Sequence, residues 1–110
     1  VREDEVVWRL EGDGFPTLVG LIVATEHLTV GKLHLLPGQN SGSLAHGGDK
    51  AVYVIAGTLH VRIFDGQRPD WFEVAAGDGC YIPQGTSHVC YNIGDRPTVA
   101  AFGVAPRYLL

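Results

Sequence analysis

The segment of residues 77–92 constrains the fold of this chain most, and it reads G-D-G-C-Y-I-P-Q-G-T-S-H-V-C-Y-N. A short apolar run, residues 80–82, leads into a Pro-Gln-Gly-Thr turn, and a second run follows the turn. Pro83 presets φ, and Gly85 can adopt the positive φ that a tight reversal needs. The segment is therefore predicted to form two antiparallel strands folded about residues 83–86.

The return strand of this segment carries polar side chains on one face. In a β-strand alternate residues point the same way, so His88, Cys90 and Asn92 share one side of the sheet. Val89 and Tyr91 point to the other side. The strand therefore presents an imidazole, a thiol and an amide to whatever lies on that side.

The rest of the chain is a series of short apolar runs separated by turn residues. With 15 glycines and 45% hydrophobic residues, the composition suits many short strands joined by tight turns. No segment shows a convincing helical period, so the pattern favours an all-β sandwich or barrel. About nine strands are predicted, at residues 6–10, 18–24, 28–36, 51–56, 58–64, 71–74, 80–82, on the return strand through His88, and at 99–104.

Length and charge limit the organisation and the partners of the chain. At 110 residues it is predicted to be a single domain, residues 1–110, with a flexible arm at residues 1–4 and a core spanning roughly residues 17–104. The net charge of −4 offers no basic field for a nucleic acid or an anionic membrane. The apolar runs are far short of the ~20 residues that a membrane span needs, and we expect a cytoplasmic protein.

Two further features leave alternatives open. Cys80 and Cys90 are predicted to be small buried thiols in a reducing compartment, although the two arms of one hairpin would also let them face each other. The loop of residues 38–48 carries four glycines and two serines. Such a loop either holds polar side chains over a cavity mouth or is a plain exposed connection.

The spacing of the 77–92 segment resembles the second motif of the cupin family, G-x5-P-x-G-x2-H-x3-N. Gly77, Pro83, Gly85, His88 and Asn92 fit it at every fixed position. The resemblance spans roughly residues 30–103 and implies a cupin double-stranded β-helix, a jelly-roll barrel. Cupins include enzymes, storage proteins and effector-sensing modules, so the function has to be argued from the site.

The first cupin motif, G-x5-H-x-H-x3-E-x6-G, is matched only in part. Gly38, His46 and Gly57 are in register with it, but Leu44 stands at the position of its first His and Lys50 at the position of its Glu. Of the four metal ligands that the resemblance implies, only His46 and His88 are present. These two imidazoles are the candidate ligands for a divalent transition metal, such as Zn, Mn, Fe or Ni, if one is bound.

Lys50 opposes a metal at this place. An ammonium ~4 Å from a divalent ion is repelled by about 8 kcal/mol at an effective dielectric constant of ~20. For Lys50 to lose its proton and coordinate the metal, its ordinary pKa would have to fall by several units, at a cost of about 4 to 5 kcal/mol. This repulsion acts only if Lys50 points inward. If the strand at residues 51–56 begins one residue late, Lys50 is instead a surface lysine.

The predicted site is therefore a cavity with one fixed positive charge and two imidazoles. It suits a sugar, a sugar acid or phosphate, or a small carboxylate, and the leading interpretation is a small-molecule-binding cupin domain with a degenerate metal site. Asn92 has an alternative role, which is to fix the hairpin through backbone hydrogen bonds. The predicted ligand-binding residues are Leu44, Lys50, Val52, Cys90, Asn92 and Phe102.

Two other functions are carried as alternatives. One is a cupin-type isomerase, epimerase or lyase, with or without a metal, in which His46 or His88 moves a proton and Lys50 stabilises an oxyanion. The other is a purely structural or assembly role. Whether the chain is an enzyme is left open. The resemblance also implies a homodimer, and the doubly apolar runs at residues 18–24 and 51–56 give a physical reason to expect one.

Overall fold

The structure, a computed structural model, describes residues 7–11, 17–65 and 68–109. The expected flexible arm at residues 1–4 lies outside the described residues. All regular secondary structure in the described part is β-strand, as the sequence predicted. No helix among these residues is long and apolar enough to cross a membrane.

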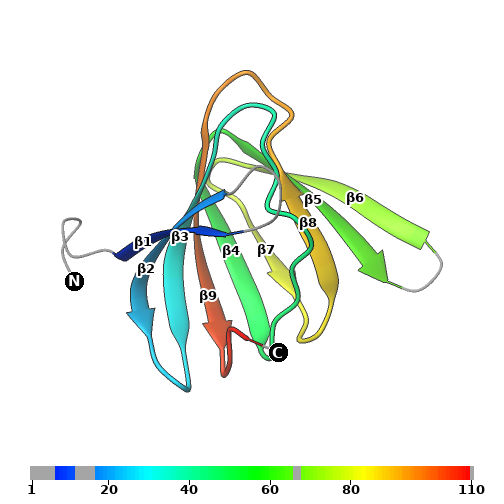
Figure 1. The fold of residues 1–110 in the computed structure, drawn as a ribbon. Coiled ribbons are helices and arrows are strands. Elements are labelled where there is room, and N and C mark those ends of the chain that lie inside the picture. The colour runs from blue at the N-terminus through cyan, green and yellow to red at the C-terminus, as the bar shows by residue number, and fades with distance from the viewer. Residues whose placement is uncertain (1–6, 12–16, 66–67, 110) are drawn as a thin grey trace.

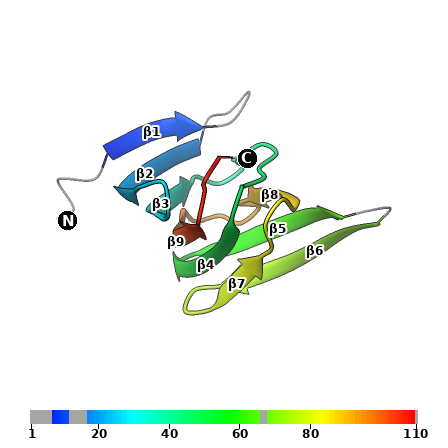
Figure 2. The ribbon, with the colours of Figure 1, turned by 90° about the horizontal axis from the view of Figure 1, so that it is seen from below.

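The described strands form two antiparallel sheets (Figure 1). The larger sheet has the order β1-β2-β3-β9-β4-β7, and the smaller has the order β6-β5-β8. Seen from below, they form two walls of one shell (Figure 2). The strands are β1 (Val7–Glu11), β2 (Thr17–Ala24), β3 (Thr29–Leu35), β4 (Asp49–Ala56), β5 (Thr58–Asp65), β6 (Arg68–Ala75), β7 (Gly79–Ile82), β8 (Ser87–Tyr91) and β9 (Thr98–Ala105).

The core lies between the two sheets because the inner strands alternate. Side chains of β3 and β9 are buried at every second residue, which is the pattern of a sheet with one covered face. β5 contributes Leu59 and Val61, both fully buried. The buried hydrophobic cluster comprises Val19, Leu33, Leu35, Val52, Val54, Leu59, Val61, Val74, Ile82, Cys90, Ala100, Phe102 and Val104.

The hairpin predicted at residues 77–92 is wrong in one respect. β7 pairs with β4, and β8 pairs with β5, so the two strands belong to different sheets. The turn at residues 83–86 exists, with Gly85 at φ 76°, and the amide of Thr86 donates to Pro83 O. This turn carries the chain across a corner from one sheet to the other. A turn sequence specifies the reversal of the chain but not which strands pair afterwards.

The glycine-rich loop after β3 is not a plain exposed connection. It runs antiparallel along β8, with isolated bridges that pair Asn40 with Tyr91 and Leu44 with His88 (Figure 1). Backbone hydrogen bonds join Leu44 and His88 in both directions, at 2.8 and 2.9 Å. The loop thereby extends the smaller sheet and brings His46 to the end of the shell at which β4 begins.

Candidate functional site

Lys50 lies inside the shell. β4 begins at Asp49, earlier than the predicted boundary, and this start turns the Lys50 side chain inward. Only 4% of the residue is exposed. Its Nζ lies 3.1 Å from Nε2 of His88 and 5.5 Å from the centroid of the Phe102 ring. The alternative of a surface lysine is therefore wrong, and the ammonium stands beside the first of the two candidate imidazoles.

His88 presents one nitrogen to Lys50 and uses the other to hold its ring. Its Nδ1 donates to the carbonyl of Thr86 at 3.0 Å, so in the neutral ring Nε2 carries the lone pair that accepts from Lys50. Burial first, and then the charges of Lys50 and His46, lower the pKa of His88 to about 4, against the opposing effect of its hydrogen bond to Thr86. The imidazole is therefore neutral at pH 7.

His46 is the second imidazole, and the loop after β3 carries it. Its Nδ1 donates to the carbonyl of Tyr108 at 2.7 Å, which in the neutral ring directs the lone pair to Nε2. The ring centroids of His46 and His88 lie 5.6 Å apart. The structure thus brings together the three residues predicted to lie at the centre of the site: His46 from a loop, Lys50 from β4 and His88 from β8.

A small enclosed cavity adjoins Lys50. Its volume of about 10 Å³ holds about one water molecule. Leu44 and Phe102, two of the predicted ligand-binding residues, lie in its wall. Its lining comprises Val19, Leu33, Ser41, Leu44, Lys50, Phe102 and Tyr108.

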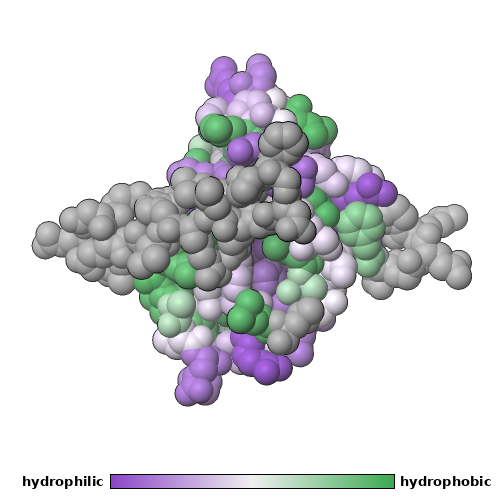
Figure 3. Space-filling view, in the orientation of Figure 1, coloured by the Kyte–Doolittle hydropathy of each residue, from purple (hydrophilic) through white to green (hydrophobic). Residues whose placement is uncertain are grey.

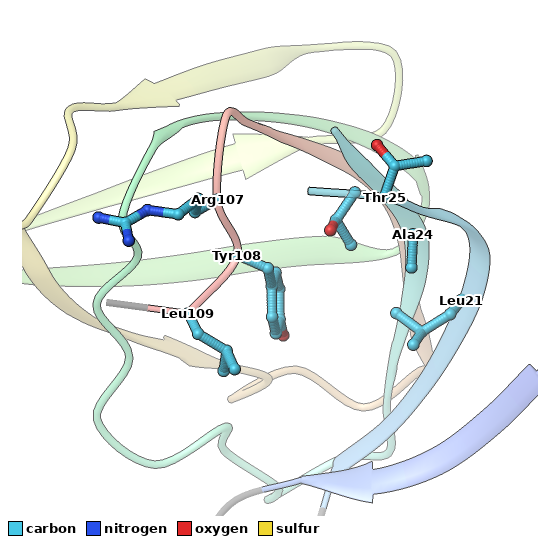
Figure 4. A pocket seen from close by; sticks show the side chains of 7 residues that line it. Leu21, Ala24, Thr25, Arg107, Tyr108 and Leu109 are labelled. Carbon is cyan, nitrogen blue, oxygen red and sulfur yellow. The ribbon is translucent and has the colours of Figure 1, made fainter. Parts of the chain in front are cut away.

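A larger pocket of about 340 Å³ lies on the other side of Tyr108, at the end of the shell (Figure 4). Leu21, Ala24 and Thr25 line it from the β2 side, and Tyr108 and Leu109 from the C-terminal segment. Hydrophobic side chains also reach the surface near the C-terminus in the space-filling view (Figure 3). Tyr108 lines both spaces, so its side chain separates the Lys50 cavity from the outer pocket.

Three residues predicted to bind a ligand do not line the Lys50 cavity. Val52 and Cys90 belong to the buried hydrophobic cluster. The Asn92 amide donates to Leu35 O at 2.9 Å and to Arg96 O at 2.7 Å, and its oxygen accepts from the Gly94 amide. These bonds join the end of β3 to the loop after β8. The Asn92 side chain thus binds backbone groups, as in the alternative prediction, although the hairpin named there does not form.

Both cysteines are free thiols, as expected, but only Cys90 is buried, whereas Cys80 is half-buried. Burial raises the pKa of Cys90, and burial followed by the neighbouring Cys90 raises the pKa of Cys80 to about 11. Neither is a thiolate at neutral pH, so neither serves as a nucleophile or a soft metal ligand in this state.

The residues around Lys50 do not fit a catalytic transition metal. Such a site usually needs three protein ligands and an open position, but only His46 and His88 offer nitrogen lone pairs here. The described residues contain no group of three or more His, Cys, Asp or Glu side chains placed to hold an ion. The Lys50 ammonium lies within hydrogen-bonding distance of His88, where its charge would repel a cation.

Tyr108 and Ser41 were not among the site residues predicted from the sequence. Tyr108 follows the last strand, where no periodic pattern indicates the direction of a side chain. Its ring lies 4.5 Å from His46 and 5.8 Å from Phe102, measured between centroids. Ser41 sits in a loop whose composition equally suited an exposed connection. For Tyr108, the one available signal was that an aromatic residue stands in a short segment after the last strand.

The profile of the Cupin domain family matches residues 31–103. No curated protein sequence matches the chain.

Several solved structures share the fold at low identity. A conserved protein of unknown function from Streptococcus pyogenes, SPY1581, has a TM-score of 0.71 and 22% identity over 89% of this chain and 79% of that one. An oxalate decarboxylase variant from Bacillus subtilis has a TM-score of 0.79 and 21% identity over 94% and 28% of the two chains. Vicilin from hazelnut, Corylus avellana, has a TM-score of 0.77 and 16% identity over 96% and 33%. This chain thus spans a third or less of the decarboxylase and of vicilin.

Proposed function

The chain belongs to the cupin superfamily, and from that premise we propose that it binds a small anionic ligand, of the carboxylate class, through the buried ammonium of Lys50. The observation that carries the proposal is the position of Nζ, 3.1 Å from His88 and almost fully enclosed. The ammonium takes the place that the cupin pattern gives to a metal ligand. The ligand then meets a protein cation directly.

A buried ammonium needs a counter-charge. Removing an ion from water costs several kcal/mol unless it is paired and hydrogen-bonded. Among the described residues no carboxylate forms an ion pair with Lys50; ion pairs there join His27 to Glu26 and His60 to Glu73. A neutral imidazole and a ring face compensate the charge only in part. A bound carboxylate would supply the missing negative charge.

The structural relatives support a carboxylate. Oxalate decarboxylase is named for a dicarboxylate, and one B. subtilis structure, with 19% identity and a TM-score of 0.77, concerns its Mn(II) centers. In this chain the donor set for such a metal is incomplete. We therefore propose direct binding of the anion to Lys50, with the imidazoles as neutral hydrogen-bonding partners.

The isomerase, epimerase or lyase alternative uses the same three residues. A general base works best when its pKa lies near the working pH. Burial and the Lys50 charge hold the pKa of His88 at about 4, so it is a weak base at neutral pH. This low basicity favours the binding function over proton-transfer catalysis.

The ligand test compares two charge deletions. Isothermal titration with oxalate, acetate and glucuronate should show binding to the wild type that Lys50→Met reduces by at least about tenfold, equal to ~1.4 kcal/mol. The chain has a second lysine, Lys32, on β3. Lys32→Met makes the same change of charge and should leave the affinity unaltered. Equal losses in the two variants would refute the proposed role of Lys50.

We also propose that the chain forms a homodimer through the outer face of the larger sheet. Tyr53 and Ile55 on β4 are 54% and 49% exposed there. Beside them lies a shallow groove of about 280 Å³, with the small residues Ala51, Ala101 and Gly103 among its lining. A large ring next to a groove of small residues is self-complementary, which is what a two-fold interface needs.

A further inference from the structure

The walls of the Lys50 site indicate the shape of the ligand. We infer that the site is a slot for a flat aromatic anion, such as a benzoate, and that the Tyr108 side chain fills this slot in the structure. The inference rests on the proposed function, because it names the ligand class of the same site. It favours aromatic carboxylates over the sugars and sugar acids that the sequence also allowed.

Two rings flank the Tyr108 ring. The centroid of His46 lies 4.5 Å away at an interplanar angle of 35°. The centroid of Phe102 lies 5.8 Å away at 28°, so these two rings are stacked. Distances of this size are typical of favourable aromatic contacts. The space that Tyr108 fills is therefore shaped for a planar ring.

The remaining walls offer little to a sugar. Val19, Leu33 and Leu44 are apolar lining residues of the adjoining cavity. Ser41 is the one hydroxyl in that lining apart from Tyr108, and it already donates to Gly42 O at 2.8 Å and accepts from the Cys90 amide at 3.0 Å. Buried hydroxyl groups without partners are costly. A polyhydroxylated ring would leave several of them unsatisfied, whereas an aromatic ring has none to satisfy.

The positive charge lies beside the slot. Lys50 Nζ is 5.5 Å from the centroid of Phe102, the ring on which Tyr108 stacks. A ligand that replaces the Tyr108 ring therefore has a cation within reach of a carboxylate substituent. The site therefore suits a ligand with a flat apolar body and one negative group, which describes a small aromatic acid.

The segment that carries Tyr108 is placed so that a ligand can displace it. Its backbone is bound at Tyr108 O by the His46 ring and at Leu109 O by the Gly47 amide, at 3.2 Å. Pro106, Arg107 and Leu109 are exposed, and the outer pocket lies against the segment (Figure 4). Withdrawal of Tyr108 would join the outer pocket to the Lys50 cavity.

The test removes the internal ring. Tyr108→Ala should bind benzoate at least about tenfold more tightly than the wild type does, because the slot is then vacant. Tyr81→Ala is the matched control, since Tyr81 is exposed on β7. Cyclohexanecarboxylate, which has the same charge but a puckered ring, and glucuronate should gain less than benzoate. Adding Lys50→Met to Tyr108→Ala should abolish the gain.

A second measurement uses the wild-type chain and so does not depend on the folding of a variant. Trypsin cleaves after arginine, and Arg107 precedes the slot residue. Saturating benzoate should accelerate cleavage at Arg107 severalfold by releasing the segment, while the rate of cleavage after Lys32, which lies within β3, stays unchanged. Unchanged or slower cleavage at Arg107 would overturn the inference.

The outcomes separate the two claims. Lys50-dependent binding of oxalate or acetate, without any gain of benzoate affinity in Tyr108→Ala, would leave the proposed function standing and overturn the aromatic slot. Equal gains for benzoate, cyclohexanecarboxylate and glucuronate would also overturn it. A failure of all these anions to bind either protein would refute both claims.

Discussion

Lys50 decides the chemistry of the site through its place in the strand. A lysine usually keeps its ammonium in water even when its stem is buried. Here the early start of β4 points the side chain into the shell, and Nζ contacts His88 Nε2 at 3.1 Å. One of the two imidazoles that would hold a metal thus contacts a protein cation. This replacement is the basis for the proposal that the site binds an anion.

Reversing that charge should restore metal binding. Lys50→Glu removes the repulsion and adds a carboxylate beside His46 and His88, giving the three protein ligands of a typical open site. After equilibration with Zn²⁺ or Mn²⁺ and desalting, elemental analysis should find close to one ion per chain in the variant and well under one in the wild type. Lys32→Glu, with the same change of charge on β3, should resemble the wild type. Equal uptake by both variants would contradict the placement of the site.

His88 should make folding sensitive to acid. Its pKa falls from the ordinary 6.5 to about 4 on folding, chiefly through burial. Between these values the unfolded chain binds a proton that the folded chain does not, so stability falls as the pH drops from 6.5 to 4. The loss should be about 3 kcal/mol. Urea unfolding at pH 7, 5.5 and 4 should show it in the wild type, with a flatter profile in His88→Gln. Parallel profiles would contradict this assignment.

At the scale of the elements, turns place the site residues by moving the chain between sheets. The β7–β8 turn is the corner that delivers His88 to the smaller sheet. The turn at Gly57 joins β4 to β5, which also belong to different sheets. Both glycines have positive φ, 74° at Gly57 and 76° at Gly85, but their surroundings differ.

Substitution at the two glycines should separate strain from crowding. A Cβ at Gly85 would meet no heavy atom within 4 Å, so Gly85→Ala should cost only the left-handed backbone penalty of about 1 to 2 kcal/mol. A Cβ at Gly57 would lie 2.5 Å from the carbonyl oxygen of Pro97. Gly57→Ala should therefore cost about 1 to 3 kcal/mol more. Chemical denaturation of both variants measures the difference, and equal losses would disprove the crowding argument.

The strands could be predicted from the sequence because alternation and turn residues are local signals. These local signals, combined with the spacing of the cupin motifs, also predicted that Lys50, His46 and His88 lie together. Strand pairing is not local, which is why β7 and β8 were wrongly predicted to form one hairpin. Tyr108 was missed for a related reason. Its position depends on contacts with His46 and Phe102 that no periodicity in the C-terminal segment encodes.

At the scale of the whole molecule, the two faces of the larger sheet have different roles. Its inner face holds Lys50 and the core, while its outer face exposes the Tyr53 and Ile55 side chains. A single chain of 11.8 kDa has little interior in which to bury large rings. Covering the outer face with a second copy would bury the Tyr53 and Ile55 side chains without disturbing the site.

The dimer should be visible in solution and sensitive to one residue. Light scattering during size-exclusion chromatography should give twice the chain mass of 11.8 kDa. Tyr53→Lys places a charge beside the groove of Ala51, Ala101 and Gly103, where a two-fold interface would bring it close to its symmetry mate, so the variant should elute as a monomer. Trp71→Lys makes the same kind of change at an exposed ring of the smaller sheet and should stay dimeric. A measured mass of one chain for the wild type at high micromolar concentration would contradict the proposed dimer. Loss of the dimer in Trp71→Lys alone would move the interface to the smaller sheet.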